Sequence, residues 1–123
     1  MSKTSLAIPI VAAVFSVPAL AESLLPVEIP PGHPALYIDR GTVARSGGVV
    51  SLTYLLQTTS GSVTHDAVID CAANTYSTRS VRLYTEHMGR GTGRAQTLRE
   101  SERAAQPIEA NSTWAFVANA VCK

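Results

Sequence analysis

The sequence predicts an α+β fold in which an antiparallel sheet of about five or six strands carries one C-terminal helix, tied to it by a disulfide. Three observations lead to this prediction. From Leu36 onward, short runs of alternating apolar residues are separated by glycine-containing turns, as in antiparallel sheets. The C-terminal residues instead place apolar side chains at helical spacing. One of the two cysteines ends a strand-like run, and the other ends the helical run.

Residues 1–21 have the features of a secretory signal peptide. Lys3 is their only charge, residues 6–17 form an apolar run, and Ala19-Leu20-Ala21 is a small-x-small cleavage site. The run is too short to cross a membrane as a helix, which needs about 20 residues. Pro9 and Pro18 argue against the alternatives, an uncleaved anchor or a buried core helix. No later segment is apolar enough to predict a transmembrane segment after cleavage.

Residues 22–35 are predicted to form a proline-rich extended leader. Proline fixes φ and removes a backbone donor, so a helix is disfavoured over an extended segment or an arm along a sheet edge. The prolines and the accompanying glycine are Pro26, Pro30, Pro31, Gly32 and Pro34.

Residues 36–123 are predicted to form the folded domain, which begins with the strands. The clearest strand is 50–56, where Val50, Leu52 and Tyr54 share one face and alternate with polar residues. Ser46-Gly47-Gly48 predicts a hairpin turn before it, because paired glycines tolerate positive φ. Further strands are expected at 36–40, 42–45, 65–71, 81–85 and 94–98, with a polar turn at 58–62.

The chain is predicted to end in a helix that starts at Asn111 or Ser112, since either side chain is able to cap the first turn. An apolar stripe follows at i, i+3, i+4, i+7 and i+8: Trp114, Val117, Ala118, Val121 and Cys122. A helix this short is marginal in water unless it packs against other structure. It is therefore expected to lie across the sheet.

Cys71 and Cys122 are the only cysteines, and an even count in an exported chain predicts one disulfide. The bridge closes a loop of about 50 residues and stabilises the fold by about 4 kcal/mol on the chain-entropy estimate. The alternative is a free nucleophile or a metal ligand. The chain has no CxxC motif, and no histidine lies near either cysteine in the sequence, so a disulfide is predicted in preference to these alternatives.

Charge argues against nucleic acid as a partner. Without Lys3, the remaining basic residues equal the nine acidic ones, so the mature chain of about 100 residues is formally neutral. It therefore lacks the basic excess that drives binding to a phosphate backbone. With 46% hydrophobic residues, the composition is that of a chain able to build a core.

No motif predicts catalysis, a metal or a cofactor. The glycines between Gly89 and Arg94 do not have the spacing of a phosphate-binding loop, and the segment precedes an expected strand instead of a helix. It is therefore predicted to be a hairpin loop. The three histidines have no ligand spacing and are expected at the surface: His33, His65 and His87. No G-x-S-x-G is present either. We therefore assign no catalytic residue, no metal site and no cofactor.

Arginines are concentrated between Arg79 and Arg103, with glutamates among them. A solvated strand face explains such a pattern, and the alternative is a surface that docks an acidic partner in a salt-sensitive way. Arginine and tyrosine side by side on one strand suit an interface. The candidate interaction surface consists of Arg79, Arg82, Tyr84, Arg90 and Arg94.

These residues taken together resemble a known family, the surface-adhesin protein E family. The resemblance covers residues 36–123 and rests on two cysteines and strand patterning: Val68-Ile69-Asp70-Cys71, Arg82-Leu83-Tyr84, the glycine loop, Pro107-Ile108 and Val121-Cys122. It implies a curved antiparallel sheet, like half a barrel, with the C-terminal helix tied into its concave side. Of the family's pattern, only Cys71 and Cys122 are transferred to this chain. The tryptophan expected shortly before Pro107 is missing.

The resemblance also indicates a function. The family consists of small exported proteins of Gram-negative bacteria, whose members bind host matrix and serum proteins, and haem binding has been ascribed to them as well. The sequence therefore predicts a non-catalytic exported binding protein with a protein partner, located in the periplasm, at the cell surface or outside the cell. The alternative is a periplasmic accessory or inhibitor protein that docks on another envelope protein.

Overall fold

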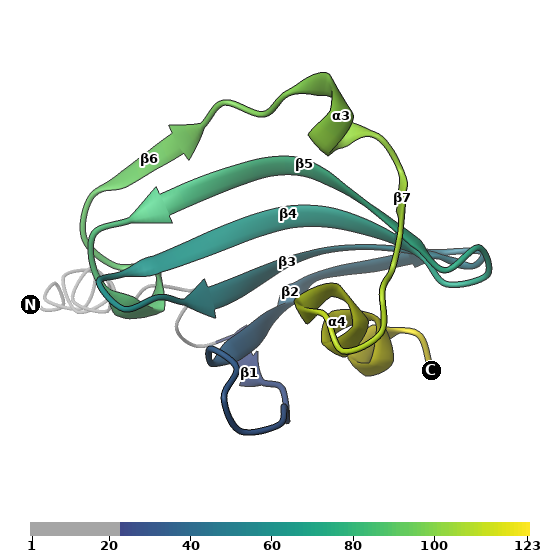
Figure 1. Ribbon diagram of the computed structural model, residues 1–123, viewed down its shortest axis with the longest axis horizontal. Helices are drawn as coiled ribbons and strands as arrows, with labels where there is room; N and C mark the ends of the chain where they lie inside the picture. Colours follow the sequence, from purple (N-terminus) through teal and green to yellow (C-terminus); the bar gives the residue numbers. More distant parts are fainter. Residues whose placement is uncertain (1–22) are drawn as a thin grey trace, which may run out of the picture.

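The computed structural model describes residues 23–123, so the predicted signal peptide lies outside the described residues. An open antiparallel sheet curves around the C-terminal helix (Figure 1). Its strands are β1 (Leu24–Pro26), β2 (Leu36–Ser46), β3 (Val49–Gln57), β4 (Ser62–Asp70), β5 (Thr75–Tyr84), β6 (Gly93–Gln96) and β7 (Gln106–Pro107). The helices are the short 3-10 helix η1 (His87–Gly89), α3 (Glu100–Arg103) and α4 (Thr113–Val121).

The sheet is a meander in which each strand from β1 to β6 pairs with the next one along the chain. The short β7 pairs with the start of β5, beyond the stretch that β6 covers. The predicted antiparallel sheet is thus confirmed, with seven strands when the short β1 and β7 are counted. β5 begins at Thr75, earlier than the predicted start at Val81. The first half of the strand is polar and lacks apolar alternation, so the sequence pattern did not reveal it.

Two irregularities in strand pairing accompany the curvature of the sheet. The register between β2 and β3 shifts between Asp39 and Ala44, and that between β4 and β5 shifts between Asp66 and Ala67. A β-bulge bends its strand and increases the local twist. β3 and β4, in contrast, pair without a shift along their whole length. Helix α4 lies on the concave side, as predicted (Figure 1).

The hydrophobic core lies between this concave face and α4. The helix contributes Val117, Ala118 and Val121, which are the buried members of the predicted apolar stripe. Strands β2, β3 and β4 contribute Leu36, Ile38, Val50, Leu52, Tyr54, Ala67 and Ile69. Each fully buried large apolar side chain contributes about 1.5–3 kcal/mol relative to an exposed one. Docking onto the sheet therefore stabilises a helix that is too short to persist alone.

Side-chain and backbone hydrogen bonds cap both ends of α4. Ser112 is the N-cap, and its Oγ accepts from the backbone N–H of Ala115 at 3.2 Å, in agreement with the predicted start. At the other end, Arg45 on β2 donates from Nη1 to the carbonyl oxygen of Val121. A cation at the C-terminus of a helix also interacts favourably with the helix dipole.

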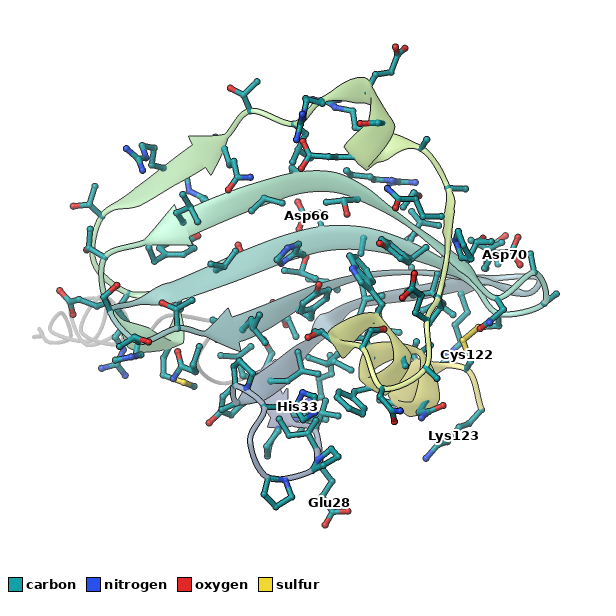
Figure 2. The ribbon with its side chains drawn as sticks, in the orientation of Figure 1. Glu28, His33, Asp66, Asp70, Cys122 and Lys123 are labelled. Carbon is teal, nitrogen blue, oxygen red and sulfur yellow. A yellow bond between two sulfur atoms is a disulfide. The ribbon has the colours of Figure 1, made fainter. Side chains whose placement is uncertain are left out.

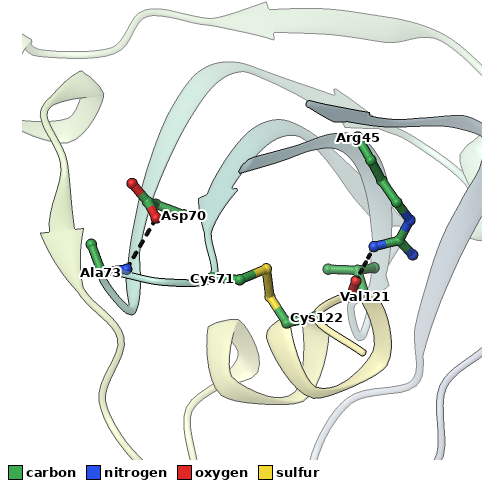
Figure 3. Close-up of a disulfide and its surroundings, with 6 residues drawn as sticks. All are labelled: Arg45, Asp70, Cys71, Ala73, Val121 and Cys122. Carbon is green, nitrogen blue, oxygen red and sulfur yellow. Dashed lines mark hydrogen bonds between the residues drawn. A yellow bond between two sulfur atoms is a disulfide. The ribbon is translucent and has the colours of Figure 1, made fainter. Parts of the chain in front are cut away.

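The predicted disulfide is present between Cys71, directly after β4, and Cys122, directly after α4. Figure 3 shows how it joins the end of the helix to the end of the strand. The turn beyond Cys71 is held by Asp70, whose carboxylate accepts from the backbone N–H of Ala73 at 3.0 Å. The bridge thus connects the two elements that enclose the core.

Gly61, in the turn between β3 and β4, is expected to tolerate no side chain. A Cβ built there would lie 2.2 Å from the carbonyl oxygen of Tyr84, so the backbone of one segment would have to move. Gly61→Ala is therefore expected to lower the free energy of unfolding by about 2 kcal/mol, measured by urea denaturation.

Gly48→Ala is the matched control, since its Cβ would lie 3.7 Å from that of Ala72, an ordinary contact. We expect this control to change stability by less than about 0.5 kcal/mol. Equal effects of the two substitutions would contradict the described packing of the β3–β4 turn against β5.

Candidate interaction surface

Strand β5 places Arg82 and Tyr84 together on the convex face of the sheet. The two residues lie two positions apart, so their side chains share a face, and the intervening Leu83 points to the concave side. Arg82 donates from Nη2 to the carbonyl oxygen of Gly93 at 3.2 Å. A Cβ at Gly93 would lie only 2.7 Å from Cε1 of Tyr84. Glycine at this position of β6 therefore allows both side chains to lie close against the neighbouring strand.

Arg79 lies in the bulge of β5, also on the convex side. Arg79, Thr53 and Asp66 line one shallow depression. Thr53 and Asp66 also line a neighbouring depression, to which Arg82 contributes. Between them, Asp66 accepts hydrogen bonds from Thr53 Oγ1 and Ser80 Oγ, both at 2.6 Å. Asp66 is labelled in Figure 2. Arg79 and Arg82 therefore flank one polar site on the convex face.

The other two residues of the candidate surface lie elsewhere. Arg94 pairs with Leu83, and opposed residues in an antiparallel pair share a face, so Arg94 projects from the concave side of β6. Arg90 follows η1 in an exposed loop, where its backbone N–H donates to the carbonyl oxygen of His87. The geometry brings together Arg79, Arg82 and Tyr84, and we call these three residues the arginine face. Its role as an interaction surface stays a prediction.

In the part of the chain that the structure describes, neither Arg79 nor Arg82 forms an ion pair, although the carboxylate of Asp66 lies between them. Within residues 23–123 the one ion pair is between Arg99 and Glu102, at 3.7 Å, and it involves neither Arg79 nor Arg82. Both guanidinium groups are exposed. The two exposed guanidinium groups, with Tyr84 beside Arg82, are able to pair with carboxylates of a docking protein, because arginine binds carboxylates with two parallel hydrogen bonds.

The concave face holds an aromatic cluster of Tyr54, His65, Tyr76 and Trp114. Trp114 at the start of α4 stacks on Tyr76 with ring centroids 4.0 Å apart, and His65 stacks on Tyr54 at 4.7 Å. The Trp114 ring also meets Tyr54 edge-on, at 5.2 Å. The cluster therefore joins the first turn of α4 to β3, β4 and β5. Burial raises the pKa of Tyr54, so its hydroxyl stays neutral.

The prediction that all three histidines lie at the surface is wrong for His65. His33 and His87 are exposed, whereas His65 is half-buried, and its Nδ1 is buried without a hydrogen-bond partner. Burial lowers the pKa of His65 to about 4, which the nearby Asp66 opposes only in part. His65 shares a face of β4 with the buried residues Ala67 and Ile69. This spacing of two residues is the sequence signal that indicates the burial of His65.

The low pKa of His65 predicts a loss of stability in mild acid. The unfolded chain binds a proton near pH 6.5 and the folded chain only near pH 4, so stability is full above pH 6.5 and falls as the pH drops towards 4. The loss is expected to be about 2–3 kcal/mol at pH 4. His65→Phe is expected to flatten this dependence in urea denaturation between pH 7 and pH 4, whereas His87→Phe should leave it intact. An unchanged pH profile in His65→Phe would contradict the assignment.

Within residues 23–123, no group of three His, Cys, Asp or Glu side chains is placed to hold a metal ion. None of the helices in the same part of the chain has both the length and the apolar character needed to cross a membrane.

Comparison with known proteins identifies the family. A family model described as surface-adhesin protein E matches residues 26–123. Crystal structures of Haemophilus influenzae protein E are similar in fold. The non-typeable strain's protein E superposes with a TM-score of 0.61 at 15% sequence identity, covering 79% of this chain and 74% of that one. A second crystal form gives a TM-score of 0.62 at 16% identity and covers 79% of this chain and 91% of that one.

No curated protein matches the chain significantly. The family model nevertheless covers most of the sequence, including both cysteines, and the shared fold agrees with it. The protein belongs to the surface-adhesin protein E family.

Proposed function

We propose that the protein is a non-catalytic adhesin, displayed at the cell surface, that binds host matrix or serum proteins. The observation that carries this proposal is the family match across residues 26–123. The signal peptide predicted at 1–21 provides the route of export, and residues 36–123 form the binding domain, to whose sheet the predicted leader at 22–35 adds strand β1. The family favours the cell surface over the periplasm, where the alternative accessory or inhibitor protein would act.

The arginine face is the surface that we assign to this binding. It lies on the convex side, away from α4 and the core, so a partner reaches it without disturbing the fold. Its two guanidinium groups are exposed, and neither forms an ion pair within residues 23–123. A partner surface that carries carboxylates is therefore expected, because charge complementarity steers encounter and selects partners.

The experiment is a binding assay of the exported protein on immobilised matrix and serum glycoproteins, read by surface plasmon resonance. Arg79→Gln and Arg82→Gln are each expected to weaken binding about fivefold to tenfold, since each removes a charge-assisted contact. Raising the salt from low to high concentration is expected to slow association.

Arg94→Gln is the matched control, because it removes the same charge from the opposite face of the sheet. It is expected to change affinity less than twofold. Failure to bind any host protein would overturn the proposed function, whereas equal losses from all three substitutions would overturn the assignment to the arginine face.

A further inference from the structure

A groove on the far side of α4 from the aromatic cluster has the composition of a binding site. It has a volume of 580 Å³ and runs between the outer side of the helix, the segment around β1 and the bulged part of β2. Ile38 and Val121, 6% and 3% exposed, belong to its lining and to the core, so the groove reaches down to the hydrophobic core. Sites for small molecules are usually clefts of about 300–1,000 Å³.

Part of the wall of the groove is apolar. Leu25 on β1, which is 44% exposed, is the one large hydrophobic side chain that residues 23–123 leave exposed, and it lines this groove. Val27 and Val43 add to the same side, and Phe116 contributes from α4. Apolar surface that gathers in a concave site, rather than scattering singly, is a mark of ligand binding.

The charged groups of the groove are mainly positive. Arg40, Arg45 and Lys123 contribute three cations, and Glu28 is the one acidic side chain of the lining. Figure 2 shows Glu28 on the loop after β1 and Lys123 beyond the end of α4. Within residues 23–123 none of these groups forms an ion pair.

Arg45 is held in place at the groove. Its Nη1 donates to the carbonyl oxygen of Val121, which fixes the guanidinium beside the apolar floor. Arg40 has no described side-chain hydrogen bond within residues 23–123 and is exposed. An anionic group between these two arginines would receive charge-assisted hydrogen bonds while an attached hydrocarbon chain lies along Leu25 and Phe116.

We propose that this groove binds a single-chain amphiphilic carboxylate of the fatty-acid class. The carboxylate pairs with Arg40 and Arg45, and the alkyl chain covers the apolar walls. The site lies apart from the arginine face, and this inference stands whether or not the protein binds host proteins.

Dodecanoate is the probe, with dodecyltrimethylammonium as the control of equal chain length and opposite charge. Both are titrated below their self-association limits into the ¹⁵N-labelled exported protein, and amide shifts report where each one binds. We expect saturable shifts around Leu25, Val43 and Phe116 with dodecanoate, and at least tenfold weaker binding of the cation. Equal affinities, or shifts centred on another surface, would overturn the proposal.

Variants separate the charge from the apolar wall. Arg40→Gln is expected to weaken dodecanoate binding about tenfold, and Arg40→Lys less than about threefold, because lysine keeps the charge. Leu25→Glu, at an exposed position that tolerates polarity, is expected to abolish binding. Arg94→Gln, outside the groove, should leave it unchanged.

Vesicles containing anionic phospholipid distinguish a monomeric ligand from a membrane surface. Saturable binding of dodecanoate without sedimentation of the protein with vesicles supports the proposal. Sedimentation with vesicles together with no dodecanoate binding would overturn it and identify the groove as a lipid-surface contact. Loss of binding in Arg94→Gln equal to that in Arg40→Gln would overturn it as well.

Discussion

Replacement of both Cys71 and Cys122 by serine is expected to lower the free energy of unfolding by about 4 kcal/mol. The bridge spans 51 residues, and a cross-link of that span removes about this much loop-closure entropy from the unfolded chain. In the folded state it holds the end of α4 against the end of β4, and so retains the helix that covers the core. For a domain of this size, the melting temperature should fall by about 15–30 °C in calorimetry.

Reductant provides the control for this prediction. Added to the wild-type protein, it should lower the melting temperature to that of the double-serine variant, and it should leave the variant itself unchanged. A wild-type protein whose two cysteines are labelled by a thiol reagent under denaturing, non-reducing conditions would contradict the disulfide. An unchanged melting temperature in the variant would contradict its energetic role.

Trp114→Ala is expected to lower the free energy of unfolding by about 3 kcal/mol. Removal of a large aromatic side chain costs about 3–5 kcal/mol when it is buried, and Trp114 is half-buried. The substitution removes the stack with Tyr76 and the edge contact with Tyr54, which join the start of α4 to the sheet. Urea denaturation followed by far-UV circular dichroism measures the loss.

Trp114→Phe is the matched variant, because it retains an aromatic ring against Tyr76. It should cost about 1 kcal/mol, and the near-UV circular dichroism of the tyrosines should persist. Removal of Trp114 is also expected to expose His65 and raise its pKa from about 4, which would reduce the acid sensitivity of the fold. Equal stability of the Ala and Phe variants would contradict the role of the aromatic cluster.

Local sequence patterns predicted much of this fold because its strands are sequential neighbours. A meander needs only short turns, so alternation in 50–56 and the glycines at 47 and 48 define a hairpin without long-range information. Helix α4 was predictable for a similar reason, since its cap at Ser112 and its apolar stripe are contiguous in the sequence. The single pair of cysteines then connected the helix to the sheet.

Features that depend on how distant strands pair could not be predicted from local sequence patterns. The bulge at Asp66 and Ala67 decides where Arg79 lies, and the pairing of β6 with β5 places Arg94 on the face opposite to Arg82. Neither follows from local composition. β7 has two residues and is defined only by its pairing with β5. The groove beside α4 combines residues from both ends of the described chain, so only the folded structure brings them together.

Protease shaving of intact cells tests the central claim, that this protein is an adhesin displayed at the cell surface. Cells that express the protein are treated with a protease that does not cross the outer membrane, and the protein is then detected by immunoblot. Osmotic shock before protease treatment serves as the comparison. We expect digestion on intact cells, with a periplasmic marker left intact. Protection of the protein until osmotic shock releases it would place it in the periplasm and contradict the adhesin function.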